Sequence, residues 1–172
     1  MPLLRGDQVV ADDWQALAAG EPLPAGGRIL VPYARLLAEP EAFAGFAGEL
    51  GVRIEPGERV EALAPWLGRL RLVAVVFPSF GDGRGFSTAR LLRERHGFAG
   101  ELRAVGNLLV DLRQFLRQCG FDSFELPEGR LLDNWRRPVT TVSLSYQTDY
   151  AVARGPEAVW QARRQRRALA AE

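Results

Sequence analysis

The sequence LRLVAVVF at residues 70–77, followed by PSFGDGRGFS at residues 78–87, decides the fold. Residues 72–77 form an unbroken apolar run, which is typical of a strand buried on both faces of a sheet. Residues 88–95 continue with the apolar spacing of a helix. A buried strand, a glycine-rich loop and a helix in this order predict one βαβ unit of a parallel sheet.

The same alternation recurs on both sides of this unit. Short apolar runs and amphipathic stretches predict further strands over 28–32, 52–54, 102–105 and 121–126, and helices over 40–50, 60–67 and 108–116. We therefore predict an α/β fold: a single small domain with a mostly parallel sheet of about five strands built from right-handed βαβ units. A small doubly wound sheet is the favoured arrangement, and part of a barrel is the alternative.

Three regions are predicted along the chain. Residues 1–27 form an N-terminal lead-in with a strand or hairpin over 7–10 and a short helix over 14–19, and residues 28–150 form the α/β domain with an irregular C-terminal extension. Residues 151–172 form an Arg-rich C-terminal helix or tail. Arginines near a helix C-terminus complement its dipole, and no aromatic residues interleave them as a nucleic-acid patch would require.

Composition excludes several chemistries. All 22 basic residues are arginine, which excludes lysine-dependent Schiff-base catalysis, and the formal charge of +1 calls for neither nucleic acid nor a membrane as partner. Cys119 and His96 are single, so no disulfide framework, Cys/His zinc site or iron–sulfur centre can be built within one chain. We expect no metal and identify no cofactor. Without an N-terminal apolar signal or a membrane-length apolar run, the protein is predicted to be cytoplasmic.

The loop between residues 78 and 88 is the candidate site. In an open parallel sheet, ligands bind beyond the carboxyl ends of the strands, where exposed N–H groups favour an anion. Asp82 is the candidate general base, with a turn residue as the alternative. Ser87 is expected to cap the following helix, which is the structural alternative to ligand binding. The predicted anion-binding residues are Gly81, Gly83, Arg84, Gly85, Ser87, Asn107 and Arg35.

This loop lacks the sharper nucleotide and hydrolase motifs. Its glycines do not have the dinucleotide-binding spacing, a Walker A loop needs lysine, and no G-x-S-x-G elbow occurs. Arg84 lies between two glycines, with few packing options in the chain, and its guanidinium suits phosphate, sulfate or carboxylate.

Internal ion pairs are expected in the sheet. Arg103 lies in an apolar strand, where an unpaired charge is costly, so it needs a carboxylate. The candidates are Asp82, Asp111 and Asp122. Asp111 is also the predicted partner of Arg90 or Arg93.

Several blocks of sequence resemble a known family. Residues 77–87, 89–95, 100–106 and 119–124 resemble the bacterial family catalogued as domain of unknown function 934. Members of that family commonly lie beside genes for assimilatory sulfite reductase, and they are often labelled as oxidoreductases involved in sulfite reduction. The resemblance implies a role in sulfate assimilation and, as partner, sulfite reductase or its electron donor.

Three functions remain open from the sequence. The first is an accessory or anion-binding protein of assimilatory sulfite reduction, without its own redox centre. The second is a small enzyme that acts on an anionic sulfur or phosphate metabolite in the Asp82/Arg84 crevice. The third is an interaction module whose arginines contact an acidic protein. Whether the chain is an enzyme stays undecided at this point.

Overall fold

The protein forms one eight-stranded sheet with helices packed on it. The computed structural model describes residues 2–79, 81–126 and 135. The strand order is β2-β1-β8-β7-β6-β5-β4-β3. The strands are β1 (Leu3–Arg5), β2 (Gln8–Val10), β3 (Gln15–Ala16), β4 (Arg28–Pro32), β5 (Glu49–Ile54), β6 (Leu70–Phe77), β7 (Glu101–Gly106) and β8 (Ser123–Glu125).

The five predicted strands are the consecutive parallel strands β4 to β8. The α/β class is therefore confirmed, but the sheet is larger and more mixed than predicted. Residues 1–27 add β3, which is parallel to β4, and the hairpin β1–β2, which is antiparallel and joins the sheet through β8. The strand or hairpin predicted over 7–10 corresponds to β2, whereas β1 and β3 were not predicted, because a segment of two or three residues is too short for a period to show.

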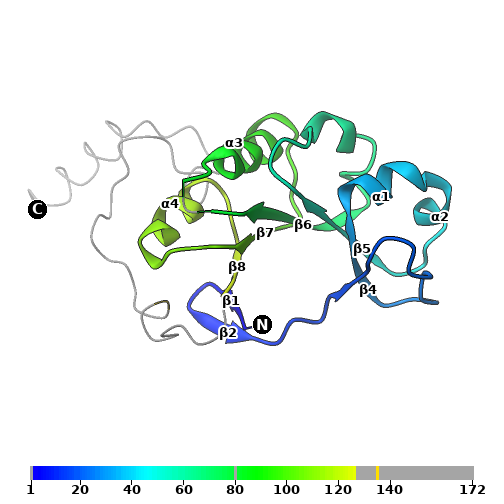
Figure 1. Ribbon diagram of the computed structural model, residues 1–172, viewed down its shortest axis with the longest axis horizontal. Coiled ribbons are helices and arrows are strands. Elements are labelled where there is room, and N and C mark those ends of the chain that lie inside the picture. The colour runs from blue at the N-terminus through cyan, green and yellow to red at the C-terminus, as the bar shows by residue number, and fades with distance from the viewer. Residues whose placement is uncertain (1, 80, 127–134, 136–172) are drawn as a thin grey trace, which may run out of the picture.

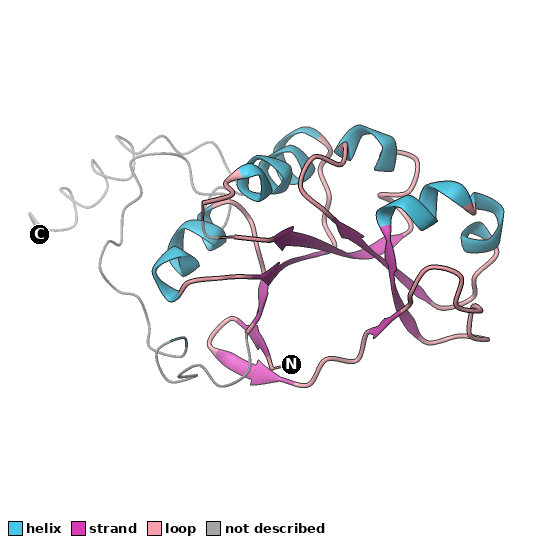
Figure 2. Cartoon of the chain, in the orientation of Figure 1, coloured by secondary structure: helices cyan, strands magenta, loops and turns pink. Residues whose placement is uncertain are grey.

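The described helices lie on one face of the sheet, so the favoured doubly wound arrangement is wrong (Figure 2). They are α1 (Tyr33–Ala38), α2 (Pro40–Ala44), α3 (Arg84–Arg90) and α4 (Arg113–Gln118). Shorter 3₁₀ turns span Val60–Leu63 and Val110–Leu112, and a π-helical turn over Leu91–Arg95 extends α3. Because β4 to β8 are neighbours in chain order, right-handed crossovers place every connection on the same side.

The sheet curls, as in the part-barrel alternative. Its edge strands β2 and β3 are joined by residues 11–14 alone. In a flat sheet of eight strands the edges would lie about 34 Å apart. So short a linker spans at most about 18 Å. The two edges must therefore approach each other, and the ribbon shows the strands bent around a concave face with the helices outside (Figure 1).

The main core lies between the helices and the convex face of the sheet. Alternate residues of the central strands enter it, among them Val52, Val73, Val75 and Leu102, all fully or almost fully buried. The concave face has a smaller apolar cluster of Ala74, Val76 and Val105, with Leu30 packed against it. Arg103 is also on the concave face, because its neighbours Leu102 and Ala104 point to the other face, into the main core under the helices.

Several predicted helices have different bounds or structures. Residues 14–19 were predicted as a helix and instead contain β3, because Gln15 and Ala16 pair with β4. The predicted helix over 40–50 is helical only over α2, while Leu50 belongs to β5 and the unpredicted helix α1 precedes the range. Helical spacing identified the buried residues Phe43 and Leu50 correctly, but pairing with β4 and β6 drew the second into a strand.

The later helices also differ from their predicted spans. The helix over 60–67 is a 3₁₀ turn that ends before Pro65, since proline disrupts helical hydrogen bonding. The helix over 88–95 begins at Arg84. The helix over 108–116 is replaced by a 3₁₀ turn followed by α4. The helix or tail predicted over 151–172 and most of the predicted C-terminal extension lie outside the described residues. Among described helices, none has the length and apolarity needed to cross a membrane.

Candidate functional site

The loop after β6 leads directly into α3. The helix begins at Arg84, with Gly83 in helical geometry at its N-cap and no side chain capping it. Ser87 therefore lies within α3, exposed, and the predicted cap is wrong. The helix starts earlier than its apolar spacing indicates because Gly85 and Ala89 are buried against the sheet and extend the inward face toward the loop.

Asp82 and Arg84 form a closed ion pair within this loop. Arg84 Nε donates to Asp82 Oδ1 at 2.9 Å and Nη2 donates to Oδ2 at 2.6 Å, while the Arg84 main-chain N–H also donates to Oδ1. These bonds hold the pKa of Asp82 below its usual value and raise the pKa of Arg84. The Arg84 side chain remains 63% exposed, whereas that of Asp82 is 13% exposed. The loop thus presents a guanidinium whose orientation is fixed by its own carboxylate.

The loop after β5 lies beside this guanidinium. Gly57 has a φ of +98°, and a Cβ placed on it would lie 3.6 Å from Arg84 Nη1. Next to it, the Glu58 carboxylate accepts the Glu55 main-chain N–H at 2.7 Å, and partial burial raises the pKa of Glu58. Residues 56–58 were not among the predicted site residues, although they follow the strand predicted over 52–54. The glycine-plus-carboxylate pattern was the available signal for this second loop.

The loop after β7 meets the end of β6 through Phe77. The Asn107 N–H donates to the Phe77 carbonyl at 2.7 Å. Gly106 has a φ of +102°, and a Cβ there would lie 2.5 Å from that carbonyl oxygen. A Cβ on Gly85 would likewise lie 2.5 Å from the Phe77 ring. The exposed Asn107 is therefore held near the carboxyl end of β6, and these two glycines are needed for close packing.

Arg35 does not join this group. It lies on α1 and is buried, with Nη1 and Nη2 donating to the carbonyls of Ala18 and Glu21 at 2.7 and 2.5 Å. Its Nε pairs with Glu39 at 3.2 Å. These bonds occupy the guanidinium, so Arg35 anchors residues 18–21 against α1. Gly81, by contrast, is exposed in the candidate loop, with open space where a Cβ would stand.

The internal ion pairs have other partners than predicted. Arg103 is paired as expected, but with Asp12 and Glu101, at 2.8 and 3.1 Å, and not with the predicted aspartates. Asp12 comes from the lead-in, which the curl of the sheet carries onto the concave face.

Asp111 is not the partner of either predicted arginine. Arg90 pairs with Glu94 at 3.5 Å, one helical turn away, and Arg93 pairs with Asp122 at 2.5 Å. Asp111 lies exposed in a 3₁₀ turn. Within the described part of the chain, no cluster of three or more His, Cys, Asp or Glu side chains could hold a metal ion.

Comparison with known proteins gives one match. Residues 51–158 match the family model described as "Bacterial protein of unknown function (DUF934)". The matched range contains the loops after β5, β6 and β7 and covers more than half of the chain. No curated protein and no solved structure matches it.

Proposed function

We propose that this chain, which belongs to the bacterial DUF934 family, is an accessory, anion-binding protein of assimilatory sulfite reduction that has no redox centre of its own. The resemblance described above supports the pathway, through the genes that accompany family members. The anion would bind at Arg84, between the loops after β5 and β6. Another protein, sulfite reductase or its electron donor, would supply electrons and cofactor.

The exposed, oriented guanidinium of Arg84 is the observation that carries the proposal. Asp82 accepts hydrogen bonds from Nε and from Nη2 of Arg84. Nη1 is left beside Gly57, facing the loop after β5. Planar guanidinium donors match the oxygens of sulfite, sulfate or a phosphate ester. A guanidinium already held in place loses little side-chain entropy when an anion binds.

The position of Arg84 in its helix limits how tightly an anion can bind there. It occupies the first position of α3, where the helix dipole disfavours a cation. Asp82 offsets this cost but also neutralises much of the charge. We therefore expect weak, exchangeable anion binding with a Kd of about 1 mM, which suits a protein that passes its ligand on.

A small enzyme in the same crevice is the second candidate. Asp82 is a poor general base because its lowered pKa makes the carboxylate less basic. Glu58, whose pKa is raised, suits proton transfer better and lies next to Gly57. In this version Arg84 binds the anionic substrate and Glu58 exchanges a proton with it.

Thermal melting with sulfite and with sulfate tests the anion site. Both anions should stabilise the protein, and Arg84→Ala should abolish the shift. Arg95→Ala is the matched control, since Arg95 is an exposed arginine at the end of the π-helical turn. Equal shifts in both variants, or none in the wild type, would overturn the site.

Growth on sulfate tests the pathway. A deletion strain should grow poorly with sulfate as sulfur source and normally with cysteine, and Arg84→Ala should fail to rescue it. Glu58→Gln separates the two candidates, because it should impair rescue only if the protein is an enzyme using Glu58. Normal growth of the deletion strain on sulfate would contradict a role in sulfite reduction.

A further inference from the structure

A cavity of about 370 Å³ lies at the edge of the sheet where β6 and β7 begin. Its two walls are the turn that leads into β6 and the turn that leads from the π-helical turn into β7. The lining residues are Leu67, Gly68, Leu70 and Arg71 from the first segment, and His96, Gly97, Phe98, Ala99 and Gly100 from the second.

The apolar part of the lining belongs to the main core. Leu70 and Phe98 are each 2% exposed and are members of the core cluster between the sheet and the helices, and Leu67 packs against that cluster. The cavity therefore lies on the helix side of the sheet. Its apolar surface is held in place by the core, as in a preformed ligand pocket.

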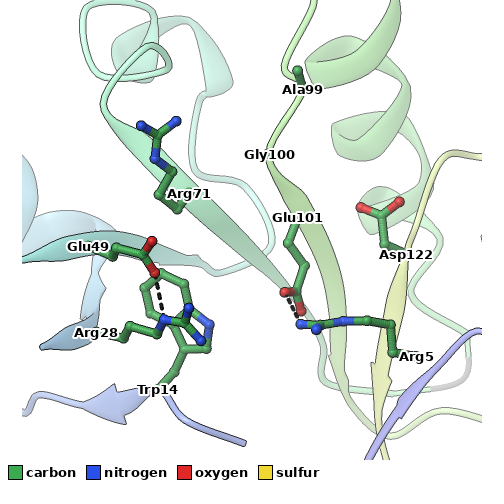
Figure 3. A pocket seen from close by; sticks show the side chains of 9 residues that line it. All are labelled: Arg5, Trp14, Arg28, Glu49, Arg71, Ala99, Gly100, Glu101 and Asp122. Carbon is green, nitrogen blue, oxygen red and sulfur yellow. Dashed lines mark hydrogen bonds and ion pairs between the residues drawn. The ribbon is translucent and has the colours of Figure 1, made fainter. Parts of the chain in front are cut away.

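Arg71 lies on the same side of the sheet as this apolar surface. It is the second residue of β6, and the residues two and four positions later, Val73 and Val75, enter the main core. In the close view Arg71 points away from Trp14 and from the Arg28–Glu49 ion pair (Figure 3). The guanidinium is thus directed away from the charged groups of the concave face.

The charge of Arg71 is not compensated within the described structure. Arg71 is exposed, and its guanidinium makes no ion pair or hydrogen bond with any residue that the structure describes. None of the described residues that line the cavity carries a carboxylate. A ligand that pairs with this side chain must therefore be an anion.

The carboxylates of the adjoining elements are already paired with other arginines. These pairs are Glu49 with Arg28, Glu101 with Arg5, Glu94 with Arg90 and Asp122 with Arg93. Arg69, in the turn before β6, donates to the main-chain carbonyls of Phe46 and Gly48, so it uses none of these carboxylates. The helix side of this edge therefore has an excess of positive charge.

His96 adds a polar group to the wall of the cavity. It follows the π-helical turn, where its main-chain N–H donates to the Leu91 carbonyl at 3.1 Å. The Nε2 atom of its ring is buried and has no hydrogen-bond partner among the described residues. Buried polar atoms normally have a partner, so the imidazole retains hydrogen-bonding capacity that the described chain does not use.

We infer that this cavity binds a small carboxylate with a compact apolar body, whose carboxylate pairs with Arg71 and whose body lies on Leu67, Leu70 and Phe98. One guanidinium suits a ligand with one negative charge, and its planar pair of N–H donors matches the two oxygens of a carboxylate. A phosphate dianion would leave one of its charges unpaired among the lining residues.

This site is separate from the anion site proposed at Arg84. Arg71 is near the beginning of β6 and Arg84 follows the other end of the strand, so the two lie about 20 Å apart along the strand. The inference does not rest on the proposed function, and a negative result at one site leaves the other untouched.

Titration of the untagged full chain with benzoate at fixed pH, followed by NMR, tests this site. The chain contains one histidine, so a single imidazole Hε1 signal reports from the wall of the cavity. Benzoate should shift this signal with a Kd of about 1 mM, as expected for a ligand of this size with one charge-assisted contact. A signal that stays unmoved at about twenty times that concentration would overturn the inference.

Two smaller changes to the ligand separate its charge from its apolar body. Benzamide keeps the ring without the charge, and acetate keeps the charge without the ring. Each should bind at least about tenfold more weakly than benzoate, because each loses one of the two contacts. Benzamide that binds as tightly as benzoate would show that Arg71 selects no anion, and equal affinity for acetate would show that the apolar surface takes no part.

A matched pair of variants identifies the arginine. Arg71→Gln should weaken benzoate binding at least about tenfold, because it removes the charge-assisted contact. Arg59→Gln is the control, since this side chain is 82% exposed and lies in the loop after β5, at the other end of the sheet. It should bind benzoate as the wild type does. Unchanged affinity in Arg71→Gln, or an equal loss in both variants, would overturn the inference.

Discussion

Asp12 Oδ2 accepts a hydrogen bond from Arg103 Nη1 at 2.8 Å, across 91 positions of sequence. Arg103 is 1% exposed, and its Nε and Nη2 both donate to Glu101 Oε1, which also accepts the Ser123 hydroxyl. A buried guanidinium is thereby paired on both sides. The contact ties the linker between the two sheet edges to the middle of the concave face.

Asp12→Ala should lower the free energy of unfolding by about 1–3 kcal/mol, because it leaves a buried charge with part of its pairing lost. Urea denaturation measures the change. Asp13→Ala is the matched control: this neighbouring side chain is 67% exposed and pairs with Arg28 at 3.3 Å, so its removal should cost at most about 0.5 kcal/mol. Equal losses of unfolding free energy at the two positions would show that the buried pair stabilises the fold no more than the exposed one.

Gly106→Ala should destabilise the protein by at least about 2 kcal/mol, since it combines a strained positive φ with a clash against the Phe77 carbonyl. Gly81→Ala, in the same group of loops, meets open space and should change stability little. Chemical denaturation of both variants checks the pair. A tolerated Gly106→Ala would mean that the β7 loop can retreat from β6.

Arg84→Ala should return the pKa of Asp82 toward its usual value, because the guanidinium is the main cause of the lowering. Carboxyl NMR titration measures this directly. The depressed pKa also has a consequence for stability. The pair stabilises the fold above the unfolded pKa of about 3.9, and this stabilisation is lost as pH falls through the lower folded pKa. Arg95→Ala should leave the Asp82 titration unchanged.

Glu58→Gln should make the protein more stable at pH 7 but not at pH 4. Burial raises the pKa of Glu58, so the folded state favours the protonated form. The stabilisation that comes from protonated Glu58 is fully present below the pKa of the unfolded state, and it is lost as pH rises through the higher pKa of the folded state. Glutamine stays neutral and keeps an oxygen for the Glu55 N–H. Urea midpoints at both pH values test this, with Glu61→Gln as a nearby exposed control.

The candidate site illustrates how far sequence reasoning reaches. Arg84, Asp82 and Asn107 were placed correctly at the carboxyl ends of β6 and β7, because strand order and loop position follow from apolar runs. Arg35 was grouped with them on the same logic, yet it is bonded to main-chain carbonyls of the lead-in. Gly57 and Glu58 were missed: their glycine-plus-carboxylate pattern marks a loop, but no local feature of the sequence places that loop beside Arg84.

The sequence by itself determined the α/β class and the five parallel strands from 28–32 to 123–125, because runs of buried apolar residues carry that information locally. Only the tertiary structure decided the curl of the sheet, the strands β1 and β3 and the partners of the buried arginines. Arg103 needs a carboxylate wherever it lies, and the sequence shows that need. Which carboxylate meets it depends on the linker of residues 11–14, which is too short to join the edges of a flat sheet and so brings Asp12 onto β7.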